Sequence, residues 1–546
     1  MYVVGNVYLI AAISVIGGAL FGFDISSMSA VISTQPYLCR FNELGFNENG
    51  SCRGLHEDVQ GGVVAAMPGG SLIGAMVSGF LSDRFGRKPT IQIGAAIWCV
   101  GSIITAAAVN VPMLAIGRVI NGFAVGICSA QVPVYISEIA KPTVRGRLIG
   151  LQQWAITWGI AIMFFICYGC SFIKSEAAFR VPWGVQAVPA VLLGLGLIIL
   201  PESPRWLAKH DRWEETLAVL ARTHGKGDSN APFVVKEMAE IRAVVEFERA
   251  NADVSYLELF RPNMIVRTSI GVATQIWSQL FLLLIAGTYF TQTGMNVMMY
   301  YITYVFTMAG LGSDVLLPSG IQFIINVVMT VPALIWMDSW GRRPTLLIGA
   351  ALMCLWLCIN AGLFATYSRP PRPEDNFTSA SMSMKIEGAP AKAVIASTYL
   401  FVASFACTWG PTSWAYPPEL YPLRLRGKAV SLATAGNWTF NFALAYFVPP
   451  AFANITWRTY VIFAVFCAAM FIHVFFLFPE TANKPLEEVS DMFDDTKPGA
   501  IRLIGTPAWK THNVRNSARR VERNEFDIED KRVGTPPATE QKETVA

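Results

Sequence analysis

Long apolar stretches recur along the chain and are separated by shorter polar segments. Most hold roughly 18 to 25 residues, the length that crosses about 30 Å of hydrocarbon as an α-helix. The pattern therefore predicts an all-α membrane protein with twelve transmembrane helices. They are expected near residues 7–32, 58–82, 90–109, 112–138, 148–171, 181–200, 265–311, 315–337, 345–367, 393–416, 428–450 and 457–478.

A polar segment divides these helices into two sets of six. Residues 1–200 hold the first set and residues 263–478 the second, with a linker at 201–262 between them. Within the linker, Arg212 to His224 and Val234 to Ala250 have the spacing of short amphipathic helices with charged faces. Residues 479–546 are polar with mixed charge, which is typical of a largely disordered tail.

The composition agrees with a membrane protein, since 53% of the residues are hydrophobic, 15% are charged and the mean hydropathy is +0.43. The net charge of +4 is too small to indicate a nucleic-acid partner. The five His and ten Cys show no metal-ligand spacing. We therefore expect no metal, no cofactor and no enzymatic activity, and a monomer surrounded by the lipid bilayer.

Basic residues gather in alternate short loops, which sets the orientation by the positive-inside rule. Both termini and the linker are predicted to be cytosolic. The basic residues behind this prediction are Arg84, Arg87, Lys88, Lys141, Arg145, Arg147, Arg342, Arg343, Arg424, Arg426 and Lys428. The opposite loops contain glycosylation acceptors at Asn49 and Asn376. Cys39 and Cys52 flank a polar segment on that oxidising side, and the sequence leaves open whether they pair in a disulfide.

Three motifs occur twice, in the same order, each at the predicted cytosolic end of a helix. They are DRFGRKPT at 83–90 and DSWGRRPT at 338–345; Glu138 with Arg145-Gly146 and Glu419 with Arg426-Gly427; and Pro201-Glu202-Ser203 and Pro479-Glu480-Thr481. Such a repeat indicates that the two halves are duplicates.

These motifs resemble the sugar porter family of the major facilitator superfamily over about residues 7–493. The resemblance also rests on GGALFGFD at 17–24, Gly117-Arg118, PESPRW at 201–206, and Gly410-Pro411 with Trp414. Within the family, NVMMYY at 296–301 and YPPELYP at 416–422 look most like the fungal high-affinity glucose transporters. The resemblance implies the major facilitator fold, with two pseudo-symmetric six-helix halves, and transport of a monosaccharide by alternating access.

In the family the repeated charges form ion pairs that hold the two halves together on the cytosolic face and break when the inside opens. The resemblance gives this role to Asp83, Arg87, Glu138, Arg145, Asp338, Arg342, Glu419 and Arg426. The alternative is ordinary positive-inside anchoring with screened surface pairs. It does not explain acids at a fixed spacing.

A sugar presents many hydroxyls and no charge, so its site needs amide side chains and an aromatic face. By resemblance, the candidates are Gln153, Gln279, Asn296, Asn326, Asn437 and Asn441, with Trp414 and Trp438 as aromatic partners. Gln152 and Ser278 have weaker claims. For any one amide the alternative is a hydrogen bond between packed helices. Many members have two successive glutamines where this chain has Ser278-Gln279, which affects its fine specificity.

Asp24 lies inside the first predicted helix, where a charge costs about 2.5–3.5 kcal/mol on insertion scales. A carboxylate that takes up and releases a proton is a sufficient reason for that cost. By resemblance, family members with an acid here are proton symporters, and Arg118 matches the arginine that pairs with it. The alternative is a permanently ionised pair that only fixes packing.

The seventh helix is interrupted by residues 281–292, which separate Gln279-Leu280 from Thr293, whereas family members join these segments directly. As a continuous helix, the extra residues would add about 18 Å and turn Gln279 away from the face that holds Asn296. Our hypothesis is that this insert is a gene-model error. The alternative is a local bulge. Peptide mass spectrometry of the native protein would reject the hypothesis by finding the insert.

We therefore expect a proton-coupled transporter of glucose or another hexose in the plasma membrane, with a sugar and a proton as partners. A facilitative carrier, or a carrier of another sugar, a polyol or quinate, is the first alternative. A sugar sensor that does not transport is the second.

Overall fold

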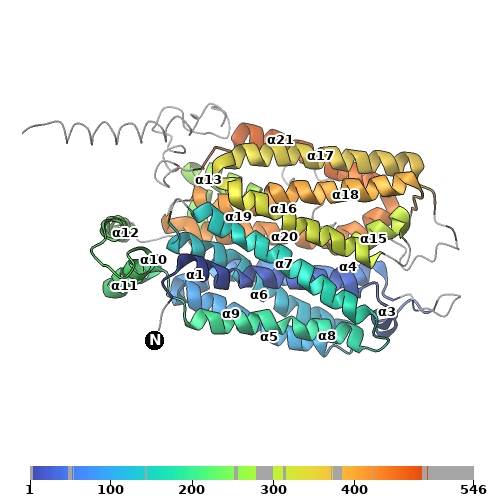
Figure 1. Cartoon of the computed structure of the whole chain (residues 1–546), viewed down its shortest axis with the longest axis horizontal. Helices are drawn as coiled ribbons and strands as arrows, with labels where there is room; N and C mark the ends of the chain where they lie inside the picture. The colour runs from blue at the N-terminus through green and yellow to red at the C-terminus, as the bar shows by residue number, and fades with distance from the viewer. Residues whose placement is uncertain are drawn as a thin grey trace, which may run out of the picture.

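The computed structural model describes residues 4–46, 52, 54–141, 144–250, 256–277, 299–311, 315–370, 372, 384–421, 423–482, 489 and 493. These residues form a bundle of long helices (Figure 1), and within them the extended pairings are isolated bridges, at Phe46 with Cys52 and at Arg369 with Lys385. The insert at 281–292, Gln279, Asn296, both glycosylation acceptors and most of the tail lie outside the described residues.

Six spans make up the first half. Their helices are α1 (Val7–Ser14) with α2 (Ile16–Val31), α4 (Glu57–Phe85), α5 (Arg87–Ala106), α6 (Val111–Ile139), α7 (Arg145–Ser171), and α8 (Ala177–Val185) with α9 (Ala187–Ile198). The short helix α3 (Gln35–Arg40) follows the first span. All six spans are long and apolar enough to cross a membrane.

The linker forms α10 (Pro204–Lys209), α11 (Trp213–His224), α12 (Pro232–Ala250) and the 3₁₀ turn Tyr256–Phe260. The three α-helices share a small apolar core that includes Leu220, Val234 and Ile241. Figure 1 shows them at one end of the bundle, beside the N-terminus. The amphipathic pattern of the linker therefore produces a separate cluster of helices outside the bundle.

The second half repeats the plan. Its helices are α13 (Pro262–Trp277), α15 (Ile302–Phe306), the π-helical turn Thr307–Leu311, α16 (Leu316–Trp340), α17 (Arg342–Tyr367), α18 (Ala389–Cys407) with α19 (Trp409–Leu420), α20 (Leu423–Ile455) and α21 (Arg458–Leu477). Four of these spans meet the same criterion of length and hydropathy as the first six. Helix α20 and the interrupted pair α13 and α15 occupy the places of the remaining two predicted spans.

The repeated motif makes the same turn in both halves. Gly86 alone separates α4 from α5, and Gly341 alone separates α16 from α17. Their φ angles of 100° and 85° belong to the region that favours glycine, so a residue with a side chain would strain the turn. We call the end of the bundle that holds segments 83–89 and 338–344 the motif end. The Trp206 indole donates to the Asp83 carbonyl at 3.1 Å, which places the linker helices at the same end.

Among the described helices, the two most extensive contacts between the halves are those of α4 with α20 and of α7 with α16. The hydroxyls of Ser78 and Ser431 lie 3.2 Å apart in the first pair. The rings of Phe164 and Phe323 are 4.9 Å apart in the second. The interior between these pairs is therefore enclosed by both halves.

Prolines inside the helices release backbone carbonyls, because proline has no N–H to offer to the carbonyl four residues earlier. Four released carbonyls each accept a hydrogen bond from a side chain of another helix in the same half. With the proline in parentheses, the pairs are Arg118 to Val64 at 3.4 Å (Pro68), Gln152 to Ser129 at 3.4 Å (Pro133), Gln275 to Ser413 at 2.7 Å (Pro417), and Tyr301 to Ala445 at 2.7 Å (Pro449).

Candidate functional site

Asp24 and Arg118 form an ion pair inside the first half. Arg118 Nη2 lies 3.1 Å from Asp24 Oδ2, and Nη1 donates to Oδ1 at 3.4 Å. Both side chains are only 1% exposed. A buried pair of this kind is costly to form, and removing one partner leaves an uncompensated charge.

Helix α4 holds the guanidinium in place. Arg118 Nε donates to the Val63 carbonyl at 2.8 Å, and Nη2 donates to the Val64 carbonyl that Pro68 releases. These two bonds do not depend on Asp24. Arg118 therefore keeps two of its hydrogen bonds when the charge of Asp24 changes.

Gln186, at the junction of α8 and α9, fixes the segment of α2 that carries Asp24. Its Nε2 donates to Ser27 Oγ at 2.6 Å and to the Phe23 carbonyl at 3.3 Å. Ser27 Oγ in turn donates to the Asp24 carbonyl at 2.9 Å. Trp98 Nε1 anchors the backbone of Gln186 with a bond of 2.7 Å to its carbonyl. Gln186 was not among the predicted site residues, although an amide in the middle of an apolar span was a signal for it.

Gln153 and Trp414 join the two halves. The indole Nε1 of Trp414, on α19, donates to Gln153 Oε1, on α7, at 2.9 Å. Both residues are buried, at 7% and 6% exposure. Two residues predicted from separate halves are therefore in direct contact.

Trp438 occupies a neighbouring position on α20. Its indole donates to Ser129 Oγ of the first half at 3.2 Å, and its ring meets Phe21 edge to face at 4.7 Å. Gln152 donates to the Ser129 carbonyl, so it supports the same position. Phe21 lies three residues before Asp24 on α2. This contact connects the aromatic candidates with the helix that carries the ion pair.

Three predicted asparagines are buried without a shared contact among the described side chains. Asn326 lies on α16, and Asn437 and Asn441 lie one turn apart on the same face of α20. Within the described part of the chain, Oδ1 of Asn326 and Oδ1 of Asn437 have no hydrogen-bond partner. Buried acceptors of this kind are normally satisfied, so they are available for a ligand.

Tyr300 and Tyr37 were not among the predicted site residues. Tyr300 is 1% exposed, interacts electrostatically with Asp24 and Arg118, and faces Asn441. Tyr37 donates to Gln60 at 3.2 Å and is also buried. Tyr300 stands within NVMMYY, which was quoted only as a family feature. A buried phenol needs a polar partner, and that requirement was the signal available from the sequence.

The motif end contains two matching ion-pair clusters. Arg87 makes a two-point contact with Glu138, at 3.0 Å on each side, and lies 3.7 Å from Asp83. Arg342 contacts Glu419 at 2.8 and 3.3 Å and lies 2.9 Å from Asp338. Ser203 donates to Glu138, and Thr481 donates to Glu419 at 2.6 Å. All three repeated motifs therefore converge in each half.

These pairs differ from the prediction in one respect. The prediction placed them between the halves, whereas the described pairs of Arg87 and Arg342 lie within a half, because each arginine and its acid come from adjacent helices of one repeat. The two repeated glycines face the other half, Gly146 in close contact and Gly427 with more space. A Cβ on Gly146 would overlap Asp338 Oδ1 and Arg342 Nη2, and a Cβ on Gly427 would lie 3.9 Å from Asp83 Oδ1.

Arg145 and Arg426 each precede one of these glycines and are buried. Arg426 Nη2 donates to the Tyr421 carbonyl at 3.3 Å. Asp338 thus approaches the amino-terminal turn of α7 in the other half, where the helix dipole favours a negative charge, and Asp83 lies near Gly427 in the second turn of α20. These are the contacts that separation of the halves at the motif end would break.

The carboxylates of Glu202 and Glu480 hold the two motif turns by accepting hydrogen bonds from their backbone N–H groups. Glu202 Oε1 accepts from the backbone N–H groups of Arg87, Lys88 and Ser203 at 3.0, 3.3 and 2.8 Å. Glu480 accepts from Arg342 and Ala482 through Oε1, at 2.8 and 2.9 Å, and from Arg343 through Oε2, at 3.0 Å. Burial raises the pKa of the Glu202 carboxyl, although its backbone donors and Arg87 oppose that shift. These two acids were predicted only as part of a repeated motif, without a role of their own.

At the opposite end of the bundle, Cys39 and Cys52 form a disulfide with a Cα–Cα distance of 5.0 Å. The Gln35 side chain accepts from the Cys52 N–H at 3.3 Å. The bond closes the polar segment after the first span into a loop. Among the described residues, no group of three or more His, Cys, Asp or Glu is placed to hold a metal ion.

A sequence profile of the family described as sugar (and other) transporter matches residues 10–493. The chain belongs to this family. Its members are transporters, which confirms the prediction that the chain is a membrane carrier and not an enzyme.

Similarity to individual transporters covers most of the chain. The MFS glucose transporter mfs1 of Aspergillus flavus is 46% identical over 92% of this chain and 91% of its own length. The high-affinity glucose transporter of Kluyveromyces lactis is 45% identical over 93% of this chain and 87% of its own length.

Among solved structures, the proton:xylose symporter XylE of E. coli, bound to 6-bromo-6-deoxy-D-glucose, is 25% identical. It superimposes with a TM-score of 0.73 over 90% of this chain and 99% of XylE. The predicted fold, a twelve-helix major facilitator in two halves, is confirmed.

Proposed function

We propose that this transporter imports glucose, or a closely related hexose, together with a proton across the plasma membrane. The observation that carries the proposal is the buried Asp24–Arg118 pair, which lies in the same interior as a set of amides and indoles. The printed names of the similar proteins support it, since two are glucose transporters and one is a proton:xylose symporter.

Proton coupling follows from the cost of the buried pair. When Asp24 is ionised, its attraction to Arg118 offsets the desolvation of both groups. When Asp24 is protonated, that attraction is lost, and Arg118 remains bonded to the carbonyls of Val63 and Val64. The two charge states therefore stabilise different arrangements of α2 and α6, and proton binding shifts the balance between them.

Sugar binding is assigned to the amides and indoles in the interior. Asn326 and Asn437 offer unpartnered oxygens that can accept sugar hydroxyl protons. The described part of the site is completed by Gln153, Asn441 and Trp414, with Trp438 behind it. The proposed site also includes Gln279 and Asn296, which lie outside the described residues. Because these side chains are uncharged, they suit a neutral polyhydroxylated ligand.

Phe21 links the two parts of the mechanism. Its contact with Trp438 connects α2, which carries Asp24, with α20, which carries two of the proposed sugar ligands. A movement of α2 on protonation thus reaches the sugar site through packed side chains. That is a two-state coupling, in which each ligand favours the arrangement that the other also favours.

Alternating access requires that one end open while the other closes. We assign the motif end to the cytosol, because its loops are rich in basic residues. Opening to the cytosol then separates Asp338 from Gly146 and Asp83 from Gly427, while the pairs inside each half stay intact. The ion pairs inside each half keep the motif turns rigid, and the close contact at Gly146 is the one that breaks and re-forms during transport.

The test is uptake of radiolabelled glucose by cells that lack their own hexose carriers, with and without a protonophore. Proton coupling predicts uptake against a gradient that collapses with the protonophore. Uptake that only equilibrates and ignores the protonophore would make the chain a facilitative carrier. Absence of uptake by protein present at the cell surface would favour a sensor, and a preference for another solute in competition would replace glucose.

A further inference from the structure

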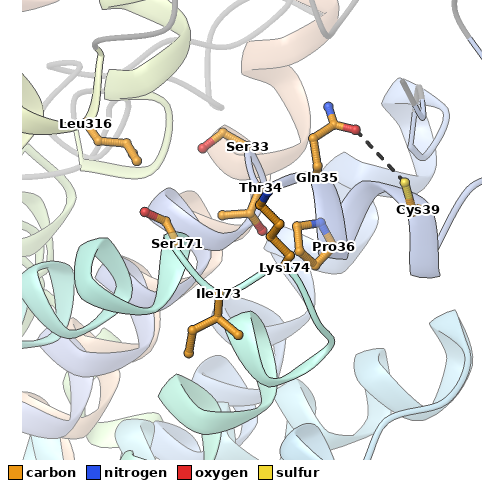
Figure 2. Close-up of a pocket in the computed structure, with 9 residues that line it drawn as sticks. All are labelled: Ser33, Thr34, Gln35, Pro36, Cys39, Ser171, Ile173, Lys174 and Leu316. Atoms are coloured by element: carbon orange, nitrogen blue, oxygen red, sulfur yellow. Dashed lines mark hydrogen bonds between the residues drawn. The ribbon is translucent and has the colours of Figure 1, made fainter. Parts of the chain in front are cut away.

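A cavity of about 460 Å³ (Figure 2) lies beside α3, at the end of the bundle opposite the motif end (Figure 1). Its walls come from the end of α2, from α3, from the end of α7 with the residues after it, and from Leu316 at the start of α16. The first three belong to the first half and Leu316 to the second. The cavity therefore spans the division between the halves, and in the proposed orientation it opens toward the outside.

Three hydroxyls line the cavity as acceptors. Ser33, Thr34 and Ser171 each donate their proton to the carbonyl three residues earlier, at 3.0, 2.7 and 2.7 Å. A hydroxyl whose O–H donates to a carbonyl still has two lone pairs that can accept hydrogen bonds. These oxygens therefore offer acceptor positions to a ligand.

Two side chains supply donors. Lys174 is exposed at the rim and takes part in none of the ion pairs of the described residues. Gln35 uses its Oε1 to accept from the Cys52 N–H, which leaves the Nε2 hydrogens available. The disulfide ties Cys52, whose N–H this glutamine accepts from, to Cys39, which also lines the cavity.

The arrangement selects against a simple anion. Three acceptor oxygens repel a phosphate or a carboxylate, whereas sugar hydroxyls can donate to them and accept from Lys174 and Gln35. Pro36, Ile173 and Leu316 add apolar surface that suits the C–H faces of a sugar ring. The volume lies within the range of small-molecule sites, about 300–1,000 Å³.

We propose that this cavity is an outer docking site, where a neutral sugar binds before it enters the buried amide site. The inference rests on the proposed function, because it names a second site for the same substrate. Since Leu316 is its contact with the other half, the cavity changes shape when the halves move. The sugar is therefore released as the transporter leaves the state that is open to the outside.

A docking site of this kind acts on capture and leaves the slow conformational step unchanged. Its loss should raise the KM for glucose and leave the maximal rate at its wild-type value. Removing one donor and one acceptor eliminates one or two hydrogen bonds, which corresponds to a rise in KM of about three- to tenfold.

The experiment compares glucose uptake by wild type, Lys174→Leu, the double variant Lys174→Leu/Ser171→Ala, and a control, Lys209→Leu. Lys209 is an exposed lysine at the motif end, far from the cavity. Rates are divided by the amount of protein at the cell surface, which separates transport from folding. We expect the KM to rise in the order control, single, double, with an unchanged maximal rate.

An unchanged KM in the double variant, or a lower maximal rate at constant KM, would overturn the docking site. Inhibition of wild-type uptake by inorganic phosphate that disappears in Lys174→Leu would also overturn it, because the cavity would then be an anion site. Wild-type uptake in the same assay tests the proposed function. Absence of uptake by the wild type would therefore reject the proposed function, and with it the docking site. Wild-type uptake with an unchanged KM in the double variant would reject only the docking site.

Discussion

The two acids behind the motif turns should respond differently to loss of charge. Glu202 receives all three of its backbone donors on one oxygen, Oε1. Glu480 divides its donors, with Arg343 alone on Oε2. Replacement by glutamine keeps one acceptor oxygen and turns the other into an NH₂ group.

In Glu202→Gln the amide oxygen can keep all three bonds. The loss of charge removes charge assistance, but it also removes the desolvation of a carboxylate whose pKa burial already raises. These effects oppose each other, so we expect stability within about 0.5 kcal/mol of wild type.

In Glu480→Gln the new NH₂ group faces the N–H of Arg343, or the amide flips and loses two bonds instead. One or two backbone donors are left unsatisfied, at a cost of about 1–3 kcal/mol. At roughly 2–4 °C per kcal/mol for a half of this size, the unfolding midpoint should fall by about 2–12 °C.

The assay is thermal unfolding of the purified transporter in detergent, with Glu214→Gln on the exposed face of α11 as the control. The midpoint of Glu480→Gln should fall clearly below those of the other two variants. If the midpoint falls equally in Glu202→Gln and Glu480→Gln, or falls further in Glu202→Gln, the distribution of donors over one or two carboxylate oxygens does not determine the effect.

Three further predictions follow from single contacts. Gly146→Ala should lower uptake at least tenfold, because its Cβ would overlap Asp338 and Arg342, whereas Gly427→Ala should stay near wild type, because its Cβ has 3.9 Å of clearance; similar rates in the two variants would contradict this. Gln186→Leu should reduce uptake about three- to tenfold at an unchanged surface level, because the variant loses the bonds that Gln186 Nε2 donates to Ser27 and Phe23; wild-type uptake by this variant would contradict that role. Burial, with Lys141 nearby, lowers the pKa of His224, so the unfolded chain binds this proton more readily and stability falls as pH drops below the ordinary value of about 6.5; between about pH 7.5 and about pH 5.5 the midpoint should fall less in His224→Asn than in wild type.

The fold could be predicted because lipid leaves few solutions for the backbone. Apolar length gave most of the spans, and the repeated motifs gave the two halves. The partner of each released carbonyl was harder to predict. Pro68 and Pro417 mark the carbonyls of Val64 and Ser413 in the sequence, but the donors come from other helices, and only their packing identifies them.

The candidate site was predicted in part. The pairing of Asp24 with Arg118 and the charges at the motif end followed from the resemblance. The resemblance did not distinguish bonds inside a half from contacts between halves, because both use the same residue types. Gly146 shows the difference, since its role depends on a missing side chain. Gln186 was missed because an amide in an apolar span usually joins helices, which it also does here.

The central claim is that a proton enters with each sugar through Asp24. The most direct measurement is the pH of a weakly buffered suspension of carrier-deficient cells when glucose is added, with wild type or Asp24→Asn at equal surface levels. The account predicts rapid alkalinisation with wild type and none with Asp24→Asn, although the variant still binds glucose. Alkalinisation of the same size with Asp24→Asn, or sugar entry through wild type without alkalinisation, would contradict it.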